Sequence, residues 1–100
     1  MAEYSVKVYP AAQNDLWDIM EAANALSAEA TARYLDTIAE KLKLLSAAPE
    51  SFPLARDTLL RIRGYRTLQV KNYVVFFIIN GKTVELHRVL PARRQYARLL

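Results

Sequence analysis

Cysteine is absent from this 100-residue chain, and histidine and glycine are scarce. Without cysteine, disulfides, thiolate nucleophiles and cysteine-bound metals are excluded. The single histidine, His87, cannot form a zinc site without a cluster of carboxylates, and the sequence offers none. The two glycines, Gly64 and Gly81, are too few for a glycine-rich phosphate loop. We therefore expect neither a metal nor a cofactor.

A long hydrophobic run is also missing. The longest apolar stretch, residues 73–79, suits a buried strand and is far shorter than the roughly 18–20 residues that span a bilayer. Residues 1–5 carry neither the basic start nor the apolar stretch of a signal peptide. These features predict a cytoplasmic protein without a membrane partner. An apolar content of 53% suits one domain with one core, over residues 1–100.

Positive charge is concentrated in the second part of the chain. Residues 1–60 hold five basic and nine acidic side chains, a net charge of −4. Residues 61–100 hold nine basic side chains and one acidic side chain, a net charge of +8. This asymmetry predicts an anionic partner for the C-terminal part. The alternative is an ordinary solvated basic surface.

The hydrophobic periodicity of the first half predicts one strand and two helices. Residues 4–9 alternate between apolar and polar side chains, as a half-buried strand does, and Pro10 suits the first position of a helix. Apolar residues spaced three and four apart predict a helix over about residues 11–25. A second helix is expected from Ser27, as its N-cap, to Pro49, so that the two helices form an antiparallel hairpin.

The second half predicts three strands. After an ordered loop at residues 49–60, a period of two appears at residues 65–71, an apolar strand at 73–79, and a returning strand at 83–90. Asn80-Gly81 predicts a type I′ hairpin turn, and residues 92–100 could form a short last helix. The expected fold is α+β, in the order β-α-α-β-β-β. The helical hairpin packs on one face of an antiparallel meander sheet to which the N-terminal strand is added.

Basic side chains of the last strands and the tail are the candidate binding residues. Guanidinium groups that converge at one strand end would bind phosphate through forked hydrogen bonds, or stabilise charge on phosphorus during RNA cleavage. The candidate nucleic-acid or phosphate-binding residues are Arg66, Lys71, Arg88, Arg93, Arg94 and Tyr96.

His87 is a candidate general acid or base, or else a sheet histidine without a catalytic role. It is expected to face away from Arg88, since consecutive residues of a strand alternate. Arg88 itself has the alternative of a structural ion pair. Asp15 and Asp18 are a weak candidate for a carboxylate pair, and a helix-dipole or solvated role is the alternative.

The chain resembles the RelE/ParE toxin superfamily. The resemblance rests on the element order, on DLWDI at residues 15–19, on VKNYVVFF at 70–77 and on RVLPARRQY at 88–96. It implies the growth-inhibiting toxin of a bacterial type II toxin–antitoxin (plasmid stabilisation) module, neutralised by a cognate antitoxin. RelE-like members cleave mRNA on the ribosome without a metal, whereas ParE-like members inhibit DNA gyrase. A homodimer, or a hetero-oligomer with the antitoxin, is expected.

The resemblance also implies functional residues. Arg93 falls where RelE-like toxins place a catalytic arginine, and Arg66 falls near a lysine of their first meander strand. Leu68 and Val74 occupy positions where basic residues are expected, and Tyr96 comes earlier than the late RelE-like tyrosine. These departures and the long helical hairpin leave three hypotheses: mRNA cleavage with Arg93, Arg66 and His87 as catalytic residues, gyrase inhibition, or a non-toxic module that only binds the antitoxin.

Overall fold

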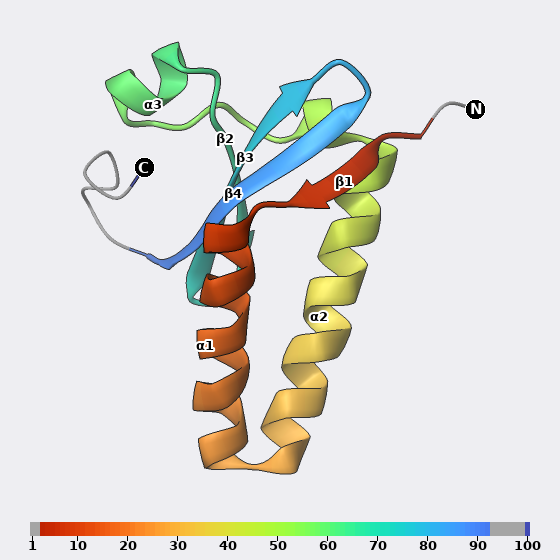
Figure 1. Cartoon of the computed structure of the whole chain (residues 1–100), viewed down its shortest axis with the longest axis vertical. Coiled ribbons are helices and arrows are strands. Elements are labelled where there is room, and N and C mark those ends of the chain that lie inside the picture. Colours follow the sequence, from red (N-terminus) through yellow and green to blue (C-terminus); the bar gives the residue numbers. More distant parts are fainter. Residues whose placement is uncertain (1–2, 93–99) are drawn as a thin grey trace.

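The structure, a computed structural model, describes residues 3–92 and residue 100, and Figure 1 shows how its elements are arranged. Along the chain these elements are β1 (Ser5–Val8), α1 (Pro10–Leu26), α2 (Ala28–Ala47), the 3-10 turn η1 (Pro49–Ser51), α3 (Thr58–Ile62), β2 (Arg66–Val70), β3 (Tyr73–Asn80) and β4 (Thr83–Pro91). The expected α+β order is confirmed.

The first helix starts and ends where local sequence dictates. Pro10 occupies its first position, where the missing N–H of proline costs nothing. Ser27 alone links the two helices: its N–H donates to the carbonyl of Ala23, and its Oγ accepts from the N–H of Ala30 at 3.0 Å. The expected N-cap is therefore confirmed, and one residue closes the hairpin.

The expected loop at residues 49–60 contains two short helical segments, so this prediction was incomplete. η1 starts at Pro49, and α3 starts after Asp57, whose Oδ1 accepts from the N–H of Leu60 at 3.2 Å. Helices this short show no amphipathic period, which explains why the sequence pattern missed them. The segment is ordered against the core as expected, because the ring of Phe52 meets the ring of Phe77 edge-on at 6.3 Å.

The four strands form one sheet in the order β1-β4-β3-β2. β2, β3 and β4 are an antiparallel meander, whereas β1 pairs with β4 in parallel. β2 is thus an edge strand. The first part of its outer edge is covered by residues 53–55, since the N–H of Thr67 donates to the carbonyl of Pro53.

The turn between β3 and β4 differs from the expected type. Asn80 pairs with Thr83, so the central residues are Gly81 and Lys82 and not Asn80 and Gly81. Gly81 has φ +60°, and Lys71, in the other hairpin, is the only non-glycine residue with positive φ among those described. Positive φ at the first central residue alone is the pattern of a type II′ turn.

The sheet is covered on both faces, as the apolar run of β3 predicts. Alternate residues of β3 enter two clusters: Val75 and Phe77 pack with α1 and α2, and Phe76 packs with the segment that contains Leu60. Phe76 and Phe77 are both essentially inaccessible to solvent. In Figure 1 the hairpin of α1 and α2 lies along one side of the sheet and projects beyond its end.

Candidate functional site

The guanidinium group of Arg66 holds the segment before α3. Arg66 Nη1 donates to the main-chain carbonyl of Phe52 at 2.7 Å and approaches that of Glu50 at 3.4 Å. Both carbonyls lie at the end of η1, and Arg66 reaches them from the start of β2. In this structure Arg66 therefore stabilises the path of the chain around the edge of the sheet.

Arg88 forms a two-pronged ion pair with Asp15. Arg88 Nε donates to Asp15 Oδ2 at 2.7 Å, and Nη2 donates to Oδ1 at 2.9 Å. The N–H of Val89 donates to the same Oδ2 at 2.9 Å. These hydrogen bonds raise the pKa of Arg88 above its ordinary value. The alternative of a structural ion pair is confirmed for Arg88, and Asp15, which lies beyond the first turn of α1, binds β4 instead of the helix dipole.

The structure does not bring the described basic candidates together. Arg66 pairs across the sheet with Phe77 and Arg88 pairs with Phe76, and these neighbours in β3 face opposite sides. Lys71 lies in the β2–β3 turn, with its Nζ 4.8 Å from the ring centre of Tyr34 on α2. The three side chains thus contact three different parts of the molecule. The remaining candidates, Arg93, Arg94 and Tyr96, lie outside the described residues.

A bulge in β4 overturns the expectation that His87 and Arg88 face opposite sides. Phe76 pairs with Arg88 and Phe77 pairs with Leu86, which leaves His87 as an extra residue. A bulge of this kind interrupts the alternation of side chains. His87 and Arg88 consequently line the same pocket, together with Tyr65.

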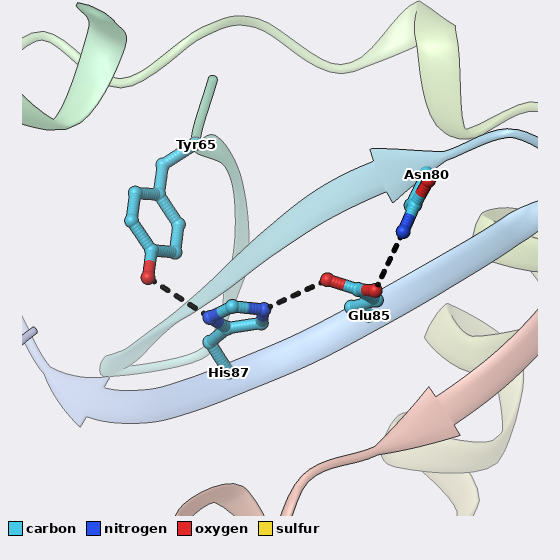
Figure 2. A network of polar contacts seen from close by, with 4 residues as sticks. All are labelled: Tyr65, Asn80, Glu85 and His87. Carbon is cyan, nitrogen blue, oxygen red and sulfur yellow. Dashed lines mark hydrogen bonds and ion pairs between the residues drawn. The ribbon is translucent and has the colours of Figure 1, made fainter. Parts of the chain in front are cut away.

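His87 is the centre of a chain of polar contacts (Figure 2). Its Nδ1 lies 2.9 Å from the hydroxyl of Tyr65, and its Nε2 lies 3.1 Å from Glu85 Oε1. Asn80 Nδ2 donates to the other Glu85 oxygen at 3.2 Å. The ring of Tyr9 stacks on the imidazole, with ring centres 4.4 Å apart and planes inclined by 18°. Three side chains therefore contact the imidazole directly, and Asn80 supports it through Glu85.

The electrostatics of this chain favour a charged carboxylate and neutral phenols. The hydrogen bonds of Glu85 with His87 and Asn80 hold the pKa of Glu85 below its ordinary value. Burial raises the pKa of Tyr65, which the positive charge of Arg63 partly opposes. Burial and then the Glu85 carboxylate raise the pKa of Tyr9. A hydroxyl, an imidazole and a carboxylate in this order can pass or hold a proton.

Sequence reasoning missed the three partners of His87, which are Glu85, Tyr9 and Tyr65. Glu85 is two residues before His87 in a strand, so the shared face could have been found from spacing alone. Tyr9 had no such signal, because it is distant in sequence and only the parallel pairing of β1 brings it near. Tyr65 had no such signal either, because it precedes β2, and β3 lies between β2 and β4 in the sheet.

A groove of about 950 Å³ runs between the edge of β2 and the segment before α3. Its lining residues include Phe52, Leu60, Gln69, Val74 and Phe76. Leu54, Leu59 and Ile62 of the adjoining segment are exposed apolar side chains. Open apolar surface next to a groove is typical of a protein-binding site.

Two kinds of site are absent from the part of the chain that the structure describes. No group of three or more His, Asp or Glu side chains there is placed to hold a metal ion. None of the helices in that part has both the length and the apolar character that crossing a membrane requires.

Comparison with known proteins establishes the family. A family model described as the ParE toxin of the type II toxin–antitoxin system parDE matches residues 6–96. The chain belongs to the ParE toxin family. A solved structure described as the chromosomal ParDE TA system from P. aeruginosa matches this ParE-family chain with a TM-score of 0.74 and 20% identity. The match covers 93% of this chain and 100% of that chain, and it confirms the fold. No curated protein matches the sequence.

The family match confirms the resemblance to the RelE/ParE superfamily and identifies a type II toxin. The structure also explains two departures from the RelE-like pattern in this ParE-family chain. Leu68 is buried in the cluster beneath the helices, where a charged side chain would be costly. Val74 packs against the cluster of the opposite face. Both side chains therefore contribute to the hydrophobic core.

Proposed function

We propose that this ParE-family chain is a growth-inhibiting toxin that acts on DNA gyrase and is neutralised by a cognate antitoxin in the cytoplasm. The observation that carries the proposal is the ParE family match over residues 6–96. Gyrase inhibition is the activity that the resemblance assigns to ParE-like members, whereas mRNA cleavage belongs to the RelE-like branch.

The geometry of the described surface supports gyrase over mRNA. Cleavage of a phosphodiester needs cationic donors preorganised around one phosphate. Arg66 and Arg88 begin on opposite faces, and each forms internal hydrogen bonds. Leu68 and Val74 pack in the core at positions where RelE-like toxins are expected to be basic, so neither position supplies a cation. Toxicity of this chain would therefore depend on contacts with a protein target.

The groove beside β2 supports an acidic, amphipathic antitoxin segment as the partner. Arg56, Arg61 and Arg63 are exposed on and beside α3. Their charges complement an acidic peptide, and the exposed apolar residues of the same segment complement its apolar side. The outer edge of β2 beyond Thr67 could accept an added strand. Antitoxin and toxin would then form one hetero-oligomer.

The proposal is tested by expressing the chain alone and with its antitoxin. Expression alone should arrest growth and induce the DNA-damage response, and coexpression of the antitoxin should restore growth. Purified chain added to purified gyrase should trap cleaved plasmid and reduce supercoiling. Normal supercoiling at concentrations that arrest growth would contradict gyrase as the target.

The second candidate function is cleavage of mRNA on the ribosome. It is favoured by the order of groups Tyr65, His87 and Glu85, and it would use Arg93 as the catalytic arginine. Programmed ribosomes exposed to the purified chain should then yield cut mRNA, and Arg93→Ala and His87→Gln should each abolish cutting. Intact mRNA rejects this candidate. Normal growth on expression alone rejects both toxic functions and favours a binding module.

A further inference from the structure

The chain of contacts around His87 forms a wall of an open pocket of about 300 Å³. The pocket is lined by Tyr9, Pro10, Ala11, Tyr65, His87, Arg88 and Leu100. Neither the gyrase proposal nor the family match assigns a role to it. Its polar groups are two phenols, an imidazole and a guanidinium, which are all suited to oxyanions.

The direction of the Tyr65 hydroxyl depends on the charge of His87. Glu85 is held by Asn80, and as a carboxylate it can only accept, so the imidazole nitrogen Nε2 must donate to it. In a neutral imidazole the other nitrogen, Nδ1, then has no proton and accepts from the hydroxyl of Tyr65. The phenol proton is thus engaged in a hydrogen bond within the protein and is not available to a ligand.

Protonation of His87 reverses this arrangement. Both ring nitrogens of an imidazolium donate, so the Tyr65 oxygen must accept from Nδ1–H and its own proton must turn away. Tyr65 and His87 both line the open pocket, and this is the space into which we expect the proton to turn. The phenol then becomes a donor to whatever occupies the pocket, and the imidazolium adds one positive charge beside it.

The other charged and titratable groups around the imidazole do not change these donor and acceptor roles of His87 and Tyr65. Tyr9, before α1, covers one ring face, and Lys7 Nζ lies 5.3 Å from the ring centre of Tyr9. On β4, Arg88 is compensated by Asp15 of α1. Arg63, before β2, adds positive charge near Tyr65. The carboxylate of Glu85 points to Nε2, on the side of the imidazole opposite Tyr65.

We propose that this pocket is a pH-dependent binding site for a phosphodiester oxyanion, in which Tyr65 donates a hydrogen bond only when His87 is protonated. Imidazole groups gain this proton between pH 8 and pH 5. Binding is therefore weak while the imidazole is neutral and strengthens when it is protonated. One added hydrogen bond to a charged oxygen corresponds to an affinity about tenfold higher. This binding site is expected whether the toxin acts on gyrase or on mRNA.

The proposal is tested with dimethyl phosphate, a phosphodiester whose charge stays constant between about pH 5 and about pH 8, the range in which imidazole titrates. Binding to the full chain is measured by NMR titration at the two ends of this range. Because His87 is the only histidine, its ring nitrogens give unambiguous signals. We expect the Nε2–H tautomer at the basic end and about tenfold tighter binding at the acidic end. The Nδ1–H tautomer, absent binding, or equal affinity at both pH values would overturn the proposal.

Two variants test whether the pH dependence of binding comes from Tyr65 and His87 or from a general effect of charge. Tyr65→Phe keeps the ring and removes the donor, so binding should be weak at both pH values. His87→Gln cannot gain a proton and should also remain weak at both, even if Tyr65→Phe disturbs the fold. Each variant is first compared with the parent chain by its amide spectrum. Preserved pH-dependent binding in either folded variant would reject the mechanism.

Discussion

The carboxylate of Asp15 is the residue on which the attachment of α1 to β4 depends most directly. It accepts two hydrogen bonds from the Arg88 guanidinium and one from the N–H of Val89. The two side chains are mostly buried, with exposed fractions of 25% for Arg88 and 12% for Asp15. Removal of one partner of such a pair leaves the other desolvated and unpaired.

Asp15→Ala should therefore lower the free energy of unfolding by about 2–3 kcal/mol. The measurement is urea unfolding at neutral pH followed by circular dichroism. Asp18→Ala is the matched control, because Asp18 is exposed on the same helix, and its effect should stay within about 0.5 kcal/mol. Equal effects of the two substitutions would show that the ion pair contributes nothing.

Glu85 should make stability fall with acid. Its pKa in the folded chain lies below the ordinary value of 4.5, chiefly through the hydrogen bond with His87. Its stabilising effect is complete above the unfolded-state pKa and is lost as the pH falls through the lowered folded-state pKa. Between about pH 5 and about pH 3, the unfolding free energy of Glu85→Gln should fall less steeply than that of the parent chain. Parallel curves would contradict this expectation.

Individual contacts were the least predictable part of the molecule from sequence. The ion pair of Arg88 was foreseen as an alternative, but its partner was not, because Asp15 is distant in the chain and reaches β4 only after α1 docks. The neighbours of His87 depend on a bulge, and a bulge leaves no mark in a hydrophobic pattern. Only Glu85 could have been found, through its spacing from His87.

At the scale of elements, Lys71 has an uncommon conformation. Its φ of +53° in the β2–β3 turn places an L-residue in the left-handed region. Lys71→Ala and Lys71→Gly both remove the ammonium group from the ring of Tyr34, so they differ only in the Cβ atom. The glycine variant should be more stable than the alanine variant by about 1 kcal/mol. Thermal or urea unfolding of the pair tests this, and a more stable alanine variant would contradict it.

The longer elements were predictable because their signals are local. The two helices have apolar spacing over several turns, and Pro10 and Ser27 mark where they start. Residues 65–71 show a period of two, and the continuous apolar run at residues 73–79 marks a strand that is buried on both faces. The five-residue helix α3 is too short to show a period, and the type of the last turn was wrong because the pairing of Asn80 with Thr83 moves the turn by one residue.

At the scale of the whole molecule, the sheet separates two cores. Phe77 lies under the helical hairpin, and Phe76 lies under the segment that contains α3. If the cores on the two faces are packed equally tightly, Phe76→Leu and Phe77→Leu should each lower the unfolding free energy by about 1–2 kcal/mol. Leu59→Ala, at a side chain that is 58% exposed, should change it by less than about 0.5 kcal/mol. A neutral Phe76→Leu would show that the second core contributes little.

The overall charge asymmetry predicted an anionic partner but not where the charges lie. Among the described residues, Arg66 and Arg88 are occupied by a carbonyl and a carboxylate of the same chain, whereas Arg56, Arg61 and Arg63 surround α3 and are exposed. Charge counted along a sequence does not distinguish cations that stabilise a fold from cations that are open to a partner.

The parallel pairing of β1 with β4 determines when folding can finish during translation. β1 leaves the ribosome well before its partner strand, which also supports α1 and starts only at Thr83. Contacts between segments so distant in sequence close slowly, since loop entropy opposes them. A nascent chain interrupted before Thr83 would thus expose apolar side chains of its first strand and helix. The native sheet is completed only after β4 has been synthesised.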